Sequence, residues 1–573
     1  MSDANAAIGT TKGPAEGASD YVMVTPDSGG TVKVGEFVYY EAEIEGAARQ
    51  VIGRVALRSP LKAFPDTFMS DPAISPGEVA RTLGFESGAA ELYEVTVNTM
   101  GHYSEGLGFV NPRIAPKPGL PVYLADPEML GRVLSPLAPG AVGAVHVGSL
   151  LTRPEGEVPV VIDGDAFTST HLAIIAGTGA GKSYLAAVIV EELLKPNNAA
   201  AVLIIDPHDE YQTLADIANL DKYRQVDAGI DYRAKGRVFR PNQIKIRRGA
   251  LADDDILYLL GDLPTPQQVI ARRALRDVRR RKRDKWVLAD LQQAIEAVEV
   301  ALDAQSIGAD ERQDDYRASK NALAIRLEAS LGQRNVFDDH EHTSMREMLQ
   351  PGQVTVVQVG EMSRRSQQTV VATLLRRAYE GRQATQRGQN DPEDELYLPF
   401  PVFVLVEEAH RFAPAGATIT TSQILSEILS EGRKFGTGVG LITQRPGKLD
   451  QDVLSQCMTQ CVMRIVNPVD QQAVASSVES IGRDLLTELP ALSRGQAIIS
   501  GSGVNATVLC RVRRRDTAHG GVSARAAQEW TDYFSPANVK RRRSGEVLFP
   551  TDDGSLKDLT AELFGKDSAD AAP

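Results

Sequence analysis

The sequence predicts an α/β fold in which helices cover a parallel sheet, with a helical insertion and a small β-barrel in front. Two apolar strands at 158–163 and 171–177 lead through a glycine-rich turn into a helix at 183–195 and a further strand at 199–206. This order is that of a βαβ unit, whose parallel strands are buried on both faces. Apolar strands of the same kind return at 353–360, 401–408 and 438–444. We therefore expect one parallel sheet to run through both parts of the chain.

The regions around this sheet have different patterns. From about residue 21 to residue 151, short β-like segments alternate with Gly and Pro, which predicts a small antiparallel barrel or sandwich. No chemistry-bearing cluster occurs there, so we interpret it as an assembly or docking module. Helical periodicity without strand signals predicts an insertion near 251–349. The expected domains are a flexible tail (1–19), a barrel-type docking domain (20–152), an α/β core (153–250 and 345–515), a helical insertion (251–344) and a C-terminal arm with a disordered tail (516–573).

The composition is that of a globular protein. Of 573 residues, 42% are apolar and 24% charged. The longest apolar runs are far shorter than the roughly 20 residues of a membrane span, and the N-terminus lacks the pattern of a signal peptide. Cys457 and Cys461 lie four apart on an expected helix without a second pair of metal ligands, so buried thiols are the better interpretation. These features predict a cytoplasmic protein without a membrane partner.

The formal net charge of −13 argues against a protein that coats nucleic acid over its whole surface. A local basic channel remains compatible with it, because charges act over a screening length of about 8–10 Å. Two clusters of basic residues stand out, at 272–285 and at 540–543.

The glycine-rich turn from Ala176 to Ser183 has the pattern of a P-loop. Phosphates need bare backbone N–H groups and a helix N-terminus, and the three glycines of this turn supply the former. Lys182 is placed to reach the β- and γ-phosphates, and the Ser183 hydroxyl to bind Mg²⁺. Ala176 stands where the strict pattern has Gly. The residues expected to bind ATP are Gly177, Thr178, Gly179, Ala180, Gly181, Lys182, Ser183 and Tyr184.

ATP hydrolysis also needs carboxylates at the end of a neighbouring strand. Glu407 and Glu408 end the strand at 401–408, where the usual pair is Asp followed by Glu. By position Glu407 would bind the metal through its water shell, and Glu408 would orient the attacking water.

A second acidic group follows the strand at 199–206. Asp206 and Glu210 are either auxiliary site residues or caps of the loop, and the sequence leaves both interpretations open. His208 and His410 have no partners at zinc-ligand spacing, so we expect ordinary hydrogen-bonding roles for them.

An arginine suited to phosphoryl transfer occurs in the segment 431–436. The planar guanidinium of Arg433 could neutralise charge on the transferred phosphoryl group. Because Arg433 lies far along the chain from its own P-loop, the nucleotide of a neighbouring subunit is the more natural target, which implies a ring; the alternative is a surface arginine in a helix-terminating loop. Gln444 ends the strand at 438–444, where it could sense the γ-phosphate and hold the attacking water.

Five segments together resemble the HerA family of ring ATPases, relatives of FtsK-type DNA pumps. They are HLAIIAGTGAGKS (171–183), LIIDPHDEY (203–211), VLVEEAHRF (404–412), EGRKFGTGVGLITQRP (431–446) and RRRDTAHGG (513–521). The resemblance spans about residues 158–521, and the β module matches the barrel domain of that family in position.

The resemblance implies a RecA-like P-loop core behind a HAS-barrel-like domain. It implies ATP and Mg²⁺ as cofactors, a homohexamer with ATP between subunits, DNA in the central channel, and a NurA-like nuclease or another effector on the barrel. It further implies that Lys182 and Ser183 bind nucleotide and metal, and that Glu408 is the catalytic glutamate. Arg433 would be the finger that acts on the next subunit, and Gln444 the sensor. Glu407 departs from the Asp that is usual in the family.

A basic channel inside an acidic ring would reconcile the net charge with DNA binding. Arg364 and Arg365 are candidates for its lining, or else part of a helix N-terminal cap region. The cluster at 272–285 lines the mouth of the channel or forms a solvated helical face, and we favour the second interpretation. No aromatic residues interleave these basic runs, so contacts would be to the DNA backbone.

The predicted function is an ATP-driven hexameric DNA translocase or helicase. It would act with a NurA-like nuclease in DNA end resection and double-strand break repair. The alternatives are the ATPase subunit of an antiviral defence complex with a sirtuin-like or nuclease effector, and a ring scaffold that binds ATP to assemble its partner. A membrane-tethered pump is disfavoured by the missing transmembrane segment, and a GTPase by the missing Asn-Lys-x-Asp motif.

Overall fold

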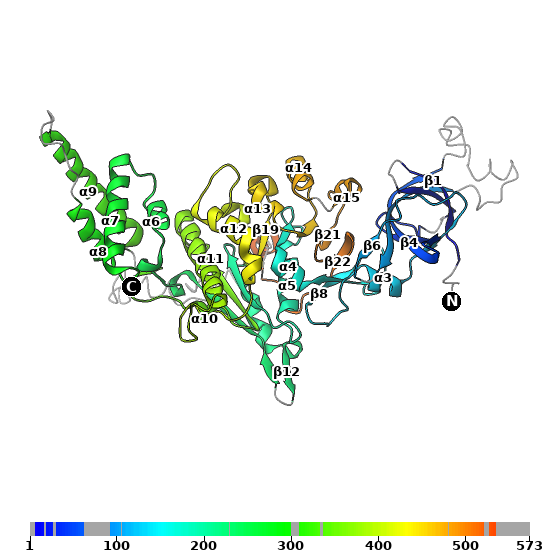
Figure 1. The fold of residues 1–573 in the computed structure, drawn as a ribbon, viewed down its shortest axis with the longest axis horizontal. Helices are drawn as coiled ribbons and strands as arrows, with labels where there is room; N and C mark the ends of the chain where they lie inside the picture. Colours follow the sequence, from blue (N-terminus) through cyan, green and yellow to red (C-terminus); the bar gives the residue numbers. More distant parts are fainter. Residues whose placement is uncertain are drawn as a thin grey trace, which may run out of the picture. The chain divides into compact units, whose positions relative to one another are not determined.

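The computed structural model describes residues 6–15, 19–26, 30–61, 92–104, 106–227, 230–298, 309–332, 336–478, 481–520 and 526–533. The chain divides into two units, Met1–Gly520 and Gly521–Pro573. The first unit contains the barrel, the large sheet and the insertion (Figure 1). In the second unit, the described residues form one helix, α16 (Ala526–Tyr533).

The N-terminal part is a closed antiparallel barrel. Its strands run in the order β2-β1-β7-β3-β4-β5, and pairing of β2 with β5 closes it. Alternate residues such as Tyr21, Met23, Val38 and Tyr40 are buried inside, as strand geometry requires. The predicted barrel is therefore confirmed. Its strands are β1 (Gly9–Pro14), β2 (Tyr21–Thr25), β3 (Phe37–Ile44), β4 (Ala47–Pro60), β5 (Tyr93–Ser104) and β7 (Pro121–Leu124), and β6 (Gly108–Val110) extends from β5.

Two boundaries of the barrel differ from those predicted. The segment Gly9–Pro14 lies in the predicted tail at 1–19, yet it forms β1 between β2 and β7. Its short polar sequence gives no alternation signal, and only the two neighbouring strands stabilise it. The strand β8 (Ala144–Leu150), predicted within 20–152, pairs with β9 and β22 of the large sheet. It therefore belongs to the core.

The core is a mixed sheet of order β14-β17-β11-β18-β19-β10-β20-β21-β22-β8-β9. The strands from β14 to β20 are parallel, and the remainder are antiparallel. The predicted α/β fold with a P-loop core is confirmed. The other strands of this sheet are β9 (Pro159–Asp163), β10 (Leu172–Ile175), β11 (Ala201–Asp206), β14 (Lys235–Phe239), β17 (Gln353–Gln358), β18 (Val402–Val406), β19 (Thr437–Thr443), β20 (Thr459–Met463), β21 (Gln496–Gly501) and β22 (Val508–Val512).

Strand periodicity divides the core into two apolar layers. Ala173 and Ile175 of β10 belong to the layer that also contains α11 (Arg364–Gln386) and α12 (Thr420–Glu431). Leu172 and Ile174 belong to the opposite layer, with α5 (Lys182–Leu193). Because successive side chains of a strand point to opposite faces, one apolar run covers both layers. The start of α5 is thereby fixed at the carboxyl end of β10.

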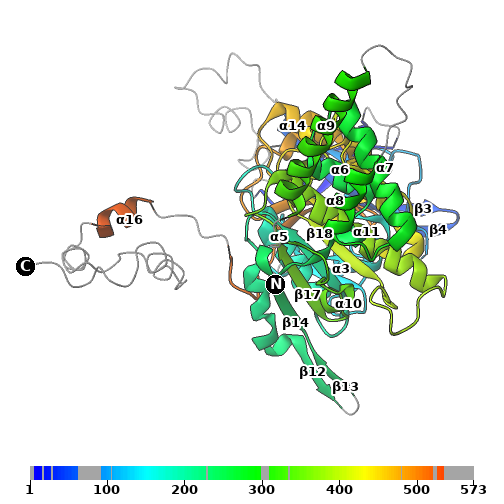
Figure 2. The same ribbon diagram turned by 90° about the vertical axis from the view of Figure 1, so that its left-hand side faces the viewer.

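The described residues of the insertion form four helices, which Figures 1 and 2 show side by side. They are α6 (Asp253–Leu260), α7 (Thr265–Lys282), α8 (Leu288–Ala297) and α9 (Ala309–Leu331). Trp286 is fully buried among them. None of the helices in the described residues is both long and apolar enough to span a membrane.

Smaller elements complete the fold. A hairpin of β12 (Arg224–Asp227) and β13 (Ile230–Arg233) projects near β14 (Figure 2). The short helices are α3 (Pro127–Val133), α4 (Gly164–Thr170), α10 (Met345–Met348), α13 (Gln451–Ser455), α14 (Pro468–Ser477) and α15 (Arg483–Glu488), and β15 (Ile246–Arg247) pairs with β16 (Phe337–Asp338).

The start of the predicted C-terminal arm at 516–573 packs on the core. The buried carboxylate of Glu191 on α5 accepts hydrogen bonds from the backbone N–H groups of Asp516 and Thr517, at 3.0 and 2.9 Å. Arg513 forms ion pairs with Glu191 at 3.3 Å and with Glu192 at 2.8 Å. The core therefore continues beyond residue 515, because a buried carboxylate needs these partners.

We expect Glu191→Ala to lower the free energy of unfolding by about 3–5 kcal/mol, because it removes one of the carboxylates that pair with Arg513 and leaves the N–H groups of Asp516 and Thr517 without an acceptor. Urea-induced unfolding followed by circular dichroism measures this. Glu128→Ala is the control, since it removes an exposed pair with Arg132 at 3.8 Å and should cost about 0.5 kcal/mol or less. Equal losses in the two variants would contradict a structural role of Glu191.

Candidate active site

The P-loop joins β10 to α5, and its glycines are required by the backbone. Gly179 and Gly181 have φ values of +75° and +110°, which side chains rarely tolerate. The N–H of Gly177 donates to the Arg464 carbonyl at 2.8 Å, and a Cβ on Gly177 would lie 2.9 Å from that oxygen. Ala176 is fully buried in the core, so a methyl group is accommodated where the strict pattern has Gly. The loop therefore presents backbone groups at a helix N-terminus, which suits an anion.

Lys182 lies between the two predicted carboxylates. Its ammonium donates to Glu407 and lies 3.2 Å from Oε1 of Glu408, and both glutamates are buried. Burial alone would lower the pKa of Lys182, but the two carboxylates outweigh burial and raise it. Burial raises the pKa of Glu407 to about 7, although Lys182 and Tyr211 act to lower it. Lys182 is therefore held protonated.

Tyr211 is a residue of the site to which the sequence analysis gave no role. It is fully buried, and its hydroxyl donates to Oε2 of Glu407 at 2.7 Å. Burial and the neighbouring Glu407 raise the pKa of Tyr211 well above its ordinary value, so the hydroxyl keeps its proton. The segment LIIDPHDEY contains this tyrosine, but nothing in its spacing indicates a partner almost two hundred residues away.

The structure separates the two interpretations of the acidic loop. The Asp206 carboxylate accepts from the backbone N–H groups of His208, Glu210 and Tyr211, at 3.1, 3.3 and 3.0 Å. It is a cap of the loop, as such side-chain-to-backbone bonds usually are. The Glu210 carboxylate instead accepts a hydrogen bond from the Ser183 hydroxyl, which places it at the P-loop.

Glu408 has a strained backbone and an open carboxylate oxygen. Its φ of +52° is uncommon for a residue with a side chain, and backbone strain of this kind recurs at active sites. Among the described residues, Oε2 of Glu408 has no hydrogen-bond donor. Nδ1 of His410 lies 3.3 Å from this oxygen. The same nitrogen is within hydrogen-bond distance of the Thr443 hydroxyl, at 3.1 Å. Burial, Arg411, Arg445 and Lys182 lower the pKa of His410 despite Glu408, so the ring tends to be neutral.

Two more polar side chains touch the P-loop. Oε1 of Gln444 accepts from the Thr178 hydroxyl at 3.0 Å, so the structure places Gln444 at the site as predicted by its strand position. Nε of Arg494 donates to the Gly179 carbonyl at 3.0 Å, and sequence reasoning did not identify this residue. The Tyr184 hydroxyl accepts a hydrogen bond from the Arg515 backbone N–H at 2.8 Å, so Tyr184 contacts the motif at 513–521.

Comparisons with known proteins agree with this geometry. The family model described as "Helicase HerA, central domain" matches residues 145–378. This match and the relatives below support membership of the HerA family. It is 29% identical over 450 residues to a probable helicase of Methanocaldococcus jannaschii, covering 77% of this chain and 80% of that protein. It is 26% identical over 539 residues to the DNA double-strand break repair helicase HerA of Pyrococcus furiosus, covering 88% and 92%.

Two solved structures were also found to be similar to parts of this chain. VirB4 of Thermoanaerobacter pseudethanolicus is 12% identical, with a TM-score of 0.44, over 66% of this chain and 98% of that one. The plasmid coupling protein TrwB in complex with ADP and Mg²⁺ is 13% identical, with a TM-score of 0.43, over 69% and 94%.

Arg433 lies at the opposite edge of the sheet from the P-loop. It is exposed on the turn before β19, at the amino ends of the parallel strands. Thr443 at the other end of β19 pairs with Ile175, which leads into the P-loop. At about 3.3 Å per residue, the length of β19 separates Arg433 from its own P-loop by roughly 20 Å. The structure therefore does not bring Arg433 to the nucleotide site of the same chain.

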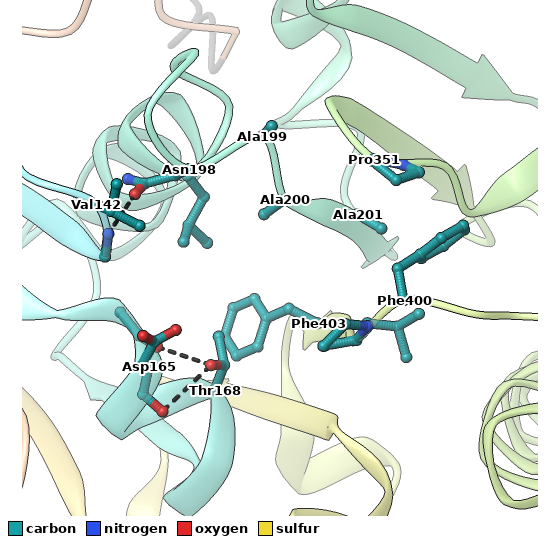
Figure 3. A pocket seen from close by; sticks show the side chains of 15 residues that line it. Val142, Asp165, Thr168, Asn198, Ala199, Ala200, Ala201, Pro351, Phe400 and Phe403 are labelled. Atoms are coloured by element: carbon teal, nitrogen blue, oxygen red, sulfur yellow. Dashed lines mark hydrogen bonds between the residues drawn. The ribbon is translucent and has the colours of Figure 1, made fainter. Parts of the chain in front are cut away.

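A small pocket also lies at the amino edge. It has a volume of about 210 Å³, and Figure 3 shows Phe403, Ala200 and Ala201 around it. Because Ala201 and Val402 begin their strands, this pocket lies away from the carboxyl ends where the P-loop sits. It is therefore not part of the nucleotide site.

The structure confirms that the cysteines are buried but corrects the predicted helix through Cys457 and Cys461. Cys457, Cys461 and Cys510 are buried and free, as predicted for structural thiols. Burial raises their pKa values, to about 12 for Cys461. The expected helix through Cys457 and Cys461 is wrong, because Cys457 follows the short α13 and Cys461 lies on β20. A spacing of four fits a helix, but the segment Thr459–Met463 is a fully buried strand that pairs with β10 and β21.

Most of the basic residues that we considered as DNA contacts form ion pairs with aspartates in the described part of the chain. In the cluster at 272–285, the side chains that pair with aspartates are Arg272, Arg279, Arg280, Arg281 and Lys282. These pairs support the interpretation as a solvated helical face. Arg365 lies 3.6 Å from Asp262, and the cluster at 540–543 lies outside the described residues.

We expect Gly181→Ala to weaken ATP binding and to destabilise the fold by about 1–2 kcal/mol, because a Cβ is disfavoured at its positive φ. A Cβ there would also lie 3.3 Å from the Met463 methyl group. Fluorescence titration with an ATP analogue and urea unfolding measure the two effects. Gly131→Ala on α3 is the matched control, because nothing lies within 4 Å of its added Cβ. Unchanged nucleotide affinity in Gly181→Ala would contradict the required loop conformation.

Proposed function

We propose that this chain is an ATP-driven DNA translocase or helicase that acts as a ring and serves DNA repair in the cytoplasm. The observation that carries this proposal is the convergence of Lys182, Ser183, Glu210, Glu407 and Glu408 at the P-loop of a HerA core. Relatives of comparable length are named DNA double-strand break repair helicases, which supports the cellular role.

The residues fit ATP and its metal. The P-loop backbone and Lys182 would hold the phosphates. The Lys182 ammonium, which pairs with two carboxylates here, would exchange these partners for the phosphate oxygens of ATP. The Ser183 hydroxyl and a neighbouring carboxylate, Glu210 or Glu407, would hold Mg²⁺. The ion would neutralise charge on the phosphates.

Hydrolysis needs a group that orients water. The open oxygen of Glu408 can accept a hydrogen bond from a water molecule, because no described donor occupies it. Gln444 lies next to the P-loop through Thr178, where its amide can respond to the γ-phosphate. We therefore assign Glu408 as the catalytic glutamate and Gln444 as the sensor.

Arg433 supports a ring. It is exposed at the amino edge, while its own P-loop lies at the carboxyl edge. In a closed ring of identical copies, one face of each subunit meets the other face of the next, so Arg433 can reach a neighbour's nucleotide. We infer a homohexamer with DNA in its channel.

The barrel supports a docking role. Its described residues contain no cluster comparable to the P-loop site, and the domain forms its own closed core. We propose that a NurA-like nuclease binds this barrel, and that the complex resects DNA ends.

Replacing Glu408 by Gln should lower ATP turnover by about 10²–10⁴-fold, because the amide cannot accept the proton of the attacking water. Steady-state phosphate release with and without duplex DNA measures turnover, and mass photometry checks that the ring persists. Glu393→Gln, at an exposed position, is the control. Turnover at the wild-type rate in Glu408→Gln would overturn the assignment.

Arg433→Ala should lower turnover by about 10³–10⁵-fold, and Lys434→Ala beside it should not. Mixing Arg433→Ala subunits with Glu408→Gln subunits should restore part of the activity. An interface then exists in which an intact Glu408 meets an intact Arg433 of the neighbour. If mixed rings stay inactive after subunit exchange is verified, Arg433 does not act on the adjacent subunit.

A further inference from the structure

A basic cavity lies beside the nucleotide site. Its volume is about 590 Å³, and it opens between the N-terminus of α11 and the loops that follow β18 and β19. The polar residues that line it are Arg364, Gln367, His410, Arg411, Arg445 and Lys448. Three separate segments of the chain thus contribute charge to one hollow.

The four cationic side chains of this cavity are not neutralised. In the described part of the chain, no carboxylate lies within ion-pair distance of Arg364, Arg411, Arg445 or Lys448. Several basic residues elsewhere are paired. Arg365 lies near Asp262, and Arg279 and Arg281 of α7 form ion pairs with aspartates. In an acidic protein, uncompensated charge gathered at one cavity is the local field that attracts an anion.

The spread of the charges indicates a polyanion. The four cations come from α11 and two loops, so a single small ion would not contact them all. Arg364 also begins a long helix, whose N-terminus favours negative charge. No Phe, Tyr or Trp lines the cavity, so it has no large ring surface on which bases would stack. Contact with a nucleic-acid backbone, independent of sequence, fits these features.

The same cavity connects to the catalytic carboxylate. His410 lines it, and Nδ1 of His410 lies 3.3 Å from Oε2 of Glu408 and 3.1 Å from the Thr443 hydroxyl. Arg411 follows His410 directly, and Arg445 follows Gln444, which contacts the P-loop. An anion held by these arginines would therefore sit next to residues of the nucleotide site.

We propose that this cavity binds backbone phosphates of DNA, and that His410 is a positioning residue through which the bound phosphate affects Glu408. The proposal rests on the proposed function, since it names the DNA contact of that motor and the link from DNA to ATP turnover. Free phosphate and the phosphates of a nucleotide share the same chemistry, and the experiment separates them.

The first test measures DNA affinity as a function of salt. A labelled duplex is titrated with wild-type protein and with Arg445→Ala and Lys448→Ala, alone and combined, by fluorescence anisotropy. Each substitution should weaken binding about tenfold at low salt, and the slope of log affinity against log salt should fall by about 1 per lost phosphate contact. Arg365→Ala and Arg272→Ala, which remove paired arginines, should retain the wild-type affinity and slope.

The outcomes separate the two proposals. If the wild-type ring binds no DNA, the proposed function fails, and this inference with it. If the wild type binds DNA and the combined variant keeps its affinity and slope, only the cavity assignment is overturned. A loss of affinity for an ATP analogue with unchanged DNA binding would assign the cavity to a nucleotide, and that result also overturns it.

The second test concerns His410. The ratio of turnover with duplex DNA to turnover without it is measured for His410→Leu and His410→Asn, with KM for ATP and DNA affinity as separate readouts. The Leu variant should lose most of the stimulation while it still binds DNA. The Asn variant should keep it, because its amide places a donor near the position of Nδ1. Wild-type stimulation in the Leu variant, or equal loss in both variants, would overturn the positioning role.

Discussion

The site depends on one cation, 11% exposed, that is shared by two buried carboxylates. The Lys182 ammonium contacts Glu407 and Glu408 at the start of α5, and the Tyr211 hydroxyl holds the far oxygen of Glu407. Removing Lys182 would leave two buried carboxylates without their cation, which costs several kcal/mol in typical proteins. The cluster therefore fixes the carboxyl ends of β10, β11 and β18 relative to one another. A bound triphosphate would compete with the carboxylates for the same ammonium, so nucleotide binding is coupled to the arrangement of these strands.

The parallel sheet places the candidate site residues at its two opposite edges, the carboxyl ends and the amino ends of its strands. Side chains that follow the strands meet at the carboxyl edge, where the P-loop, Gln444 and Glu210 lie. Arg433 precedes β19 and lies at the amino edge. A strand cannot be shortened without losing the sheet, so one chain cannot bring Arg433 to its own P-loop. The proposed role of Arg433 at a nucleotide therefore requires a second copy, and this geometric constraint is the physical argument for the proposed ring.

Charge is distributed so that attraction is local. Aspartates pair with Arg272, Arg279, Arg280 and Arg281 of α7. In contrast, Arg364, Arg411, Arg445 and Lys448 face one cavity without described acidic partners. In a protein of net charge −13, a DNA backbone would be repelled from most of the surface and attracted there. The short connection from this cavity through His410 to Glu408 would let DNA binding and ATP hydrolysis influence each other over a few ångströms.

The sequence by itself determined the parts of this protein that depend on local chemistry. Apolar runs of strand length predicted the parallel sheet, and the glycines with Lys182 and Ser183 predicted the P-loop, because positive φ and phosphate contact demand particular residues at fixed spacing. Only the tertiary structure decided which distant segments meet. It placed β1 in the barrel and β8 in the core, and it packed the start of the predicted C-terminal arm against Glu191. It also showed that Asp206 caps its own loop, that Glu210 contacts Ser183, and that Tyr211 and Arg494 lie at the site. These contacts join residues far apart in the chain, and their energies arise from burial and pairing after folding, which no local pattern records.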